Sequence, residues 1–407
     1  MRRNAALFVL ISLLSGFGST ALTLAARIWV LDLTGSVSLA GLTGLCLYAP
    51  TFASPWLGAL VDRLPRRPLL IWGDVVLGLT LLSLLTVGSI AGVWLIFLVL
   101  LTRGAGYVVL DAGETAILPA TLPTAALGEV NGWRASAQEG MKLIAPLAGA
   151  GLYAWRGPVP VVLMCATMPL LAAACYALLR IRPGPSTQPA PAGLPAPPAL
   201  SGRSARAGWV VLLRSGSVRV PVLVAAVSIA MSGLTGAAVL ARVVHGLHLP
   251  ATHLGLLASA QGAGSIVGGL LVGRLLARLG PARVAALGAA LFAAGCVAWC
   301  LPWWPALIAG SAVVGFGLPW TLIAGITAVQ TRTPEYLLGR AGATANMVMF
   351  GPVALAIPIG SVSVRAGARL TLVVAAGLAL AAALGGFAAG RRLETSTKRA
   401  PGANRTG

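Results

Sequence analysis

Long apolar segments separated by short polar ones dominate the pattern of this chain. They lie at residues 5–31, 37–61, 68–90, 92–118, 130–155, 158–181, 218–243, 253–278, 283–301, 304–329, 340–363 and 368–390. Most of them reach the roughly 20 residues that a helix needs to cross about 30 Å of hydrocarbon. They lack the strict alternation that marks the strands of a membrane barrel. The pattern therefore predicts an all-α membrane protein with twelve transmembrane helices.

The composition indicates that much of the exterior faces lipid. The 407 residues are 57% hydrophobic and only 9% charged, whereas about a quarter of the residues in a soluble globular domain are charged. So few charges cannot cover the surface of a water-soluble particle of this size. In lipid, only helices and closed barrels satisfy the polar groups of the backbone.

The net charge of +20 predicts a membrane topology rather than a nucleic-acid partner. Only two of the 29 cations are lysines, and the arginines fall in short clusters between the apolar segments. If the N-terminus is cytoplasmic, most cations lie at the cytoplasmic ends of the spans, which is the positive-inside pattern. We therefore expect a multi-pass protein of the bacterial inner (plasma) membrane, with both termini in the cytoplasm and no bound nucleic acid.

The spans divide into two related halves. A Pro/Ala/Ser-rich stretch at 183–207 separates them six and six, and its composition is typical of an extended linker. The loop 123–128 (PTAALG) after the fourth span is echoed by 334–339 (PEYLLG) after the tenth. The predicted organisation is an N-terminal six-helix bundle at 1–182, a cytoplasmic linker at 183–207, a C-terminal six-helix bundle at 208–392 and a disordered cytoplasmic tail at 393–407. In transporters built from such repeats, the substrate site lies near the bilayer midplane between the repeats.

Charged side chains inside the predicted spans are candidates for function, because each costs about 2.5 kcal/mol or more near the bilayer centre. They are Arg27 in the first span, Arg103, Asp111 and Glu114 in the fourth, and Glu139 and Lys142 in the fifth. Arg103 and Glu114 project from nearly one helix face, with Asp111 close to it. Each group also has a purely structural interpretation. The two acids of the fourth span can pair with arginines, and Glu139 and Lys142, at i and i+3, can neutralise each other. Arg27 can snorkel toward the membrane surface.

The loop between the second and third spans combines a glycine with clustered charges. Residues 58–67 read GALVDRLPRR. Gly58 permits close helix approach because it lacks a side chain, and Asp62 is an anion next to Arg63, near Arg66 and Arg67. A simpler interpretation is a topology signal with ion pairing at the surface.

This loop resembles the signature loop of the major facilitator superfamily, and the resemblance covers essentially the whole chain. Residues 29–36 (WVLDLTGS) and the loop positions Pro123, Leu127, Gly128 and Asn131 are similar to the branch that contains macrolide-type drug exporters and siderophore exporters, which work as proton antiporters. The resemblance implies the major facilitator fold, with two pseudo-symmetric six-helix bundles. It also implies a conformational latch formed by Gly58, Asp62, Arg63 and Arg67, and a role in proton transfer for the segment that begins at Arg103.

These features favour secondary active transport. The sequence contains no phosphate-binding glycine loop and no nucleophile elbow, so we expect no enzyme activity and no cofactor. The five cysteines lie in apolar segments, and we expect no metal site. Our leading hypothesis is proton-coupled efflux of a drug, siderophore or secondary metabolite by a monomer that alternates access in the bilayer, with Asp111 and Glu114 as the leading proton-binding groups. The alternatives are a proton-coupled nutrient importer of the same fold and a non-transporting membrane scaffold or sensor.

Overall fold

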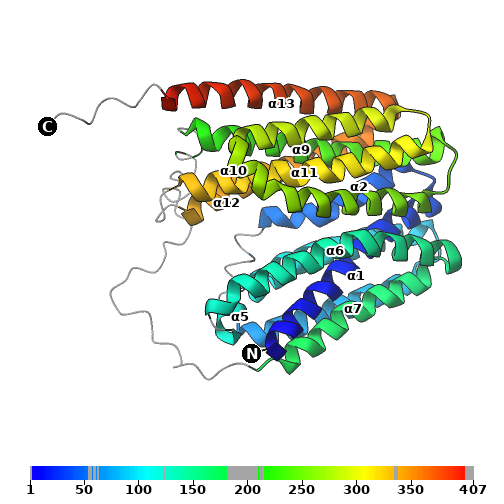
Figure 1. The fold of residues 1–407 in the computed structure, drawn as a ribbon. Helices are drawn as coiled ribbons and strands as arrows, with labels where there is room; N and C mark the ends of the chain where they lie inside the picture. Colours follow the sequence, from blue (N-terminus) through cyan, green and yellow to red (C-terminus); the bar gives the residue numbers. More distant parts are fainter. Residues whose placement is uncertain are drawn as a thin grey trace. The chain divides into compact units, whose positions relative to one another are not determined.

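The fold is that of a helical membrane protein (Figure 1). The computed structural model describes residues 2–53, 64–122, 124–180, 215–333 and 338–398, together with 57, 61, 210 and 212. Within these ranges the regular structure is helical throughout. Three residues of the expected latch, Gly58, Asp62 and Arg63, lie outside the described residues, as does the linker 183–207.

The helices of the first half follow the first six predicted spans. They are α1 (Arg2–Thr34), α2 (Val37–Tyr48) with the short 3-10 helix η1 (Ala49–Ala53), α4 (Arg66–Leu82), α5 (Val93–Thr121), α6 (Thr124–Arg156) and α7 (Pro158–Leu178). At the start of α2, the Ser36 hydroxyl accepts a hydrogen bond from the Leu39 amide, as N-terminal caps do. Gly157, with φ of +73°, separates α6 from α7.

The helices of the second half follow the remaining spans. They are α9 (Gly216–Ala241), α10 (Leu254–Cys300), α11 (Trp304–Arg332), α12 (Leu338–Ser363) and α13 (Ala368–Lys398). Two predicted spans fall within α10, which is broken at Gly280, where φ is +75°. Glycine adopts that conformation without steric cost, and Pro281 suits the first turn of the helix that follows. α13 continues through Lys398, into the segment expected to form the tail.

Length and hydropathy identify membrane-spanning helices in both halves. Nine helical segments of the described chain are long and apolar enough to cross a bilayer, and Val37–Ala53 is a shorter apolar helix. α10 counts once among the nine although it covers two predicted spans, and α6 falls outside them because it carries several charged residues. The predicted all-α membrane architecture is confirmed.

The chain forms two compact units. One comprises Met1–Gly193 with Val239–Gly262, and the other comprises Leu194–Ala238 with Ala263–Gly407. In the first unit, α1 packs against α6 and α7, and α4 packs against α5 and α7. Small residues allow these close approaches: a Cβ on Gly104 of α5 would lie 2.6 Å from the Cys46 carbonyl oxygen of α2.

Polar side chains brace one end of the first unit around the C-terminus of α7. Arg67 donates to the carbonyl oxygens of Tyr176, at 3.3 Å, and Ala177. The buried Asn4 amide donates to the carbonyl oxygens of Thr121 and Arg180 at 3.2 and 2.8 Å. A cation at a helix C-terminus satisfies carbonyl groups that lack partners and complements the helix dipole. Arg67 therefore has a bracing role within its own unit, whatever part it takes in the latch.

Candidate functional site

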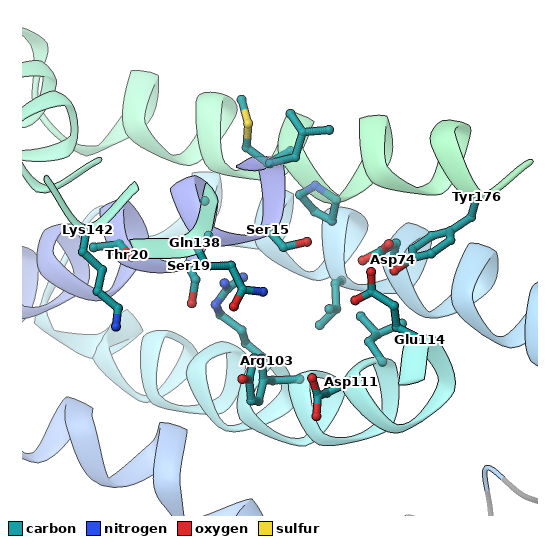
Figure 2. A pocket seen from close by; sticks show the side chains of 18 residues that line it. Ser15, Ser19, Thr20, Asp74, Arg103, Asp111, Glu114, Gln138, Lys142 and Tyr176 are labelled. Carbon is teal, nitrogen blue, oxygen red and sulfur yellow. The ribbon is translucent and has the colours of Figure 1, made fainter. Parts of the chain in front are cut away.

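A cavity of about 210 Å³ lies within the first unit (Figure 2). Its lining comes from α1, α4, α5, α6 and α7. The lining residues are Leu14, Ser15, Gly16, Gly18, Ser19, Thr20, Asp74, Leu77, Arg103, Tyr107, Leu110, Asp111, Glu114, Gln138, Lys142, Met168, Pro169 and Tyr176. Five charged and six neutral polar side chains face one space in a bundle otherwise built of apolar residues. Such a convergence of polar groups in a concave site is typical of a binding site.

Glu114 of α5 forms a buried ion pair with Arg134 of α6. The distance from its Oε2 to Arg134 Nη2 is 2.8 Å, and both side chains are only about a tenth exposed (11% and 12%). Arg134 also donates to Ser12 Oγ at 3.2 Å and to Asn131 Oδ1 at 3.1 Å. The other carboxylate oxygen, Oε1, is buried and accepts no hydrogen bond of normal geometry from the described residues. Glu114 thus combines one strong contact with one oxygen that has only the neighbouring Tyr176 side chain to interact with.

Asp74 of α4 is a buried carboxylate that the sequence-based candidates omit. It is 4% exposed, and within the described residues it forms neither a hydrogen bond nor an ion pair. Figure 2 shows Asp74, Glu114 and Tyr176 together at one end of the cavity. The helices meet closely here, since a Cβ on Gly73 would lie 2.9 Å from Leu110 Cδ2 of α5. The close approach of α4 and α5 brings the Asp74 carboxylate into the electrostatic neighbourhood of both Glu114 and Arg103.

Arg103 of α5 extends into the cavity. None of its N–H groups forms a hydrogen bond or an ion pair with a described residue, although Asp74 is among its electrostatic neighbours. Figure 2 shows the guanidinium extending toward the side of the cavity that carries Ser19 and Gln138. The Gly104 contact with α2 described above fixes the helix next to this arginine. The result is a cation directed into the cavity.

The other predicted residues divide between the cavity and its surroundings. Asp111 lines the cavity, and so does Lys142, whose ammonium pairs with Glu139 one turn earlier on α6. Glu139 itself is not part of the lining. Arg27 also lies outside the lining, and its Nε is buried without a hydrogen-bond partner among the described residues. Of the six predicted intramembrane residues, the cavity therefore collects Arg103, Asp111, Glu114 and Lys142.

Sequence reasoning missed Asp74 and Arg134 for different reasons. Asp74 stands inside the third apolar segment, so the rule that singled out Asp111 and Glu114 applies to it equally. Arg134 stands near the start of the fifth span, and its position suggested a topology signal. Its pairing with Glu114, twenty residues away on another helix, follows only from the packing of α5 and α6.

The carboxylates are distributed unequally between the halves. None of the six predicted spans between 218 and 390 contains an Asp or a Glu, whereas the first half carries several within its spans. Within the described residues, no group of three His, Cys, Asp or Glu side chains is arranged to hold a metal ion. Any proton that binds to a carboxylate within the predicted spans must therefore bind in the first half.

Comparison with known proteins identifies the family. The family model of the Major Facilitator Superfamily matches residues 8–246 and again 221–406. Comparison with curated proteins finds no match.

Solved structures share the fold over nearly the whole chain. A mutant form of the nucleoside transporter NupG is 16% identical, with a TM-score of 0.73 over 95% of this chain and 99% of that one. A bacterial homologue of the iron transporter ferroportin in an inward-facing state is 16% identical, with a TM-score of 0.68 over 96% and 99%. A POT family transporter in complex with 5-aminolevulinic acid is 11% identical, with a TM-score of 0.72 over 96% of each chain. Because the family model matches both halves of the chain, this protein belongs to the major facilitator superfamily of membrane transporters and is not an enzyme.

Proposed function

We propose that the protein is a proton-coupled exporter of a small organic molecule, working by alternating access. The observation that carries this proposal is the pair of buried carboxylates, Asp74 and Glu114, at one end of the cavity. Two carboxylates that share a desolvated site repel each other when both are charged. A single proton on either carboxylate removes that repulsion, so the pair is suited to bind and release one proton per cycle.

Arg134 gives the proton a way to change the structure. When Glu114 is charged, the ion pair with Arg134 holds α5 and α6 together at this point. Protonation of Glu114 removes the anion and leaves Arg134 to its weaker contacts with Ser12 and Asn131. A proton therefore biases the relative stability of two arrangements of the same helices, as a coupling ion must do.

Competition in the cavity makes the coupling an exchange of proton for substrate. Protons and a positively charged group of a substrate are both attracted by Asp74, Asp111 and Glu114. Because the site binds only one of the two at a time, binding of substrate releases the proton. The motif resemblance to drug and siderophore exporters favours the outward direction for the substrate. On this proposal Asp111 contributes to substrate attraction, and the Asp74–Glu114 pair holds the proton.

The proposal also covers the oligomeric state, the membrane topology and the latch. A monomer in the bacterial plasma membrane, with both termini in the cytoplasm, alternates between states that a latch of Gly58, Asp62, Arg63 and Arg67 helps to select. Of the latch residues, only Arg67 is among those described, and it donates hydrogen bonds to carbonyl oxygens at the end of α7.

The test uses inside-out membrane vesicles that contain the protein and hold an imposed pH gradient, acidic inside. A pH-sensitive dye in the lumen reports proton efflux while compounds are added one at a time from a panel of antibiotics, dyes, siderophores and amino-acid derivatives. We expect at least one compound to dissipate the gradient faster than in vesicles without the protein. The Glu129→Gln variant, changed at an exposed acid of α6, serves as the control and should behave as wild type. Gradient-driven uptake of a compound in right-side-out vesicles, acidic outside, would contradict the export direction.

A further inference from the structure

The charges of the cavity are segregated along its length. Figure 2 shows Arg103 and Lys142 toward one side and Asp74, Asp111 and Glu114 toward the other. Lys142 is paired with Glu139, and Glu114 with Arg134. The cavity charges without an ion-pair partner within the described residues are therefore one cation, Arg103, and two anions, Asp74 and Asp111.

Arg103 is the group that most requires a ligand. A guanidinium carries five N–H donors in a planar fork, and here none of them meets an acceptor among the described residues. A cation at this depth in a membrane helix is costly unless it is paired. The fork geometry matches a carboxylate, which accepts two parallel hydrogen bonds. The cavity thus offers a prepared site for a carboxylate group.

A ligand that satisfied only Arg103 would leave the acidic side of the cavity unmatched. Asp111 lies eight residues further along α5, about 12 Å along the helix axis. Apolar side chains, including Leu77, Leu110 and Met168, complete the lining. A matching ligand therefore has a carboxylate at one end, a short apolar body and a positive group at the other end.

We propose that the cavity binds a small zwitterion, whose carboxylate is held by Arg103 and whose ammonium group faces Asp74 and Asp111. This inference rests on the proposed function, because it names the substrate class of the same cavity. It also explains why substrate and proton exclude each other: the ammonium group takes the place of the proton as counter-charge to the carboxylates. A purely anionic compound is repelled by the carboxylates of Asp74 and Asp111, and a purely cationic one leaves Arg103 without a counter-charge.

The experiment measures binding to the purified full-length protein in detergent, with no membrane and no gradient. Thermal unfolding is followed in the presence of 6-aminohexanoate, hexanoate, hexylamine and hexanamide, which share one apolar body and carry both charges, one or none. A fifth probe, 2-aminohexanoate, carries both charges on adjacent atoms. We expect 6-aminohexanoate to raise the unfolding temperature most, since a ligand stabilises the folded state in proportion to RT ln(1 + [L]/Kd).

Variants at Arg103 test the assigned contact. Arg103→Gln should weaken 6-aminohexanoate binding at least tenfold, and Arg103→Lys, which keeps the charge without the fork, should weaken it several-fold. The matched control is Arg156→Gln: Arg156 stacks on Trp155 at the end of α6, with its guanidinium carbon 4.5 Å from the ring centroid, and lies outside the lining. This control should bind as wild type does. The unfolding temperature of each variant without probe shows whether it folds, so an unfolded Arg103→Gln leaves Arg103→Lys to decide.

The zwitterion proposal is overturned if 6-aminohexanoate does not bind, or if hexanoate or hexylamine stabilises the protein as much as 6-aminohexanoate does. It is also overturned if 2-aminohexanoate binds more strongly than 6-aminohexanoate, or if both Arg103 variants bind 6-aminohexanoate as wild type does. Proton coupling plays no part in this measurement. Binding as expected together with a silent vesicle assay would therefore refute the proposed function and leave the ligand class standing.

Discussion

Replacing Arg134 by glutamine is expected to destabilise the first unit by about 3–5 kcal/mol, the cost of leaving a buried charge without its partner. Glu114 is 8% exposed, and Arg134 is its ion-pair partner at 2.8 Å. The loss also removes the hydrogen bonds that Arg134 donates to Ser12 and Asn131. The measurement is the amount of monodisperse protein recovered in detergent, together with its thermal unfolding temperature.

A double variant separates the buried charge from the lost packing. In Arg134→Gln/Glu114→Gln the two side chains are neutral and can hydrogen-bond to each other, so most of the lost stability should return. Arg156→Gln is the control for the removal of an arginine from α6 and should unfold as wild type does. If Arg134→Gln is no less stable than this control, or if the double variant is no more stable than the single one, the ion pair does not hold α5 to α6 as we infer.

The second large effect is expected from neutralising both acids of the proton-binding pair. In Asp74→Asn/Glu114→Gln no proton is available for exchange, so a pH gradient can no longer drive accumulation. With one proton per substrate, a gradient of two pH units supports an accumulation ratio of about 100, because each unit is worth about 1.4 kcal/mol. The double variant should therefore lose about 100-fold in accumulation and only equilibrate its substrate.

Exchange of labelled for unlabelled substrate across proteoliposomes without a gradient is the companion measurement. Such exchange requires the cavity and the alternation between states but no net proton movement. Because Arg103 and Asp111 remain, we expect the double variant to retain exchange once the substrate concentration is raised to offset the lost Asp74 charge. Glu129→Gln should match wild type in both assays. Gradient-driven accumulation that survives in Asp74→Asn/Glu114→Gln would place the coupling proton elsewhere.

The helices could be predicted from the sequence because length and apolarity determine membrane crossing. The twelve apolar segments correspond to the observed helices, and the break between the eighth and ninth segments falls at Gly280 and Pro281, the residues that end and restart a helix most readily. Where α6 and α7 meet, only two or three residues separate the segments, and the positive φ of Gly157 marks the boundary. These are local properties of the chain, so local patterns suffice to predict them.

The cavity could be predicted only in part, because pairing between helices is not a local property. Charged residues inside membrane spans are energetically costly, and this rule alone selects Arg103, Asp111, Glu114 and Lys142. The ion pair between Lys142 and Glu139 follows from their i, i+3 spacing. Spacing along the chain cannot show that Arg134 faces Glu114, nor that Arg27 stays outside the cavity while Asp74 enters it. Those facts depend on how α1, α4, α5 and α6 rotate and pack, which small residues such as Gly73 and Gly104 determine.

Proton release on substrate binding shows directly whether substrate and proton compete for the same carboxylates. The purified protein is held in weakly buffered detergent solution with a pH indicator, and a compound identified in the vesicle assay is added at saturation. If substrate replaces a proton at Asp74 and Glu114, wild type should release about one proton per substrate bound, and Asp74→Asn/Glu114→Gln should bind the compound and release none. Equal proton release from both proteins, or binding to wild type with no proton release at any pH between about 5 and 8, would contradict this competition.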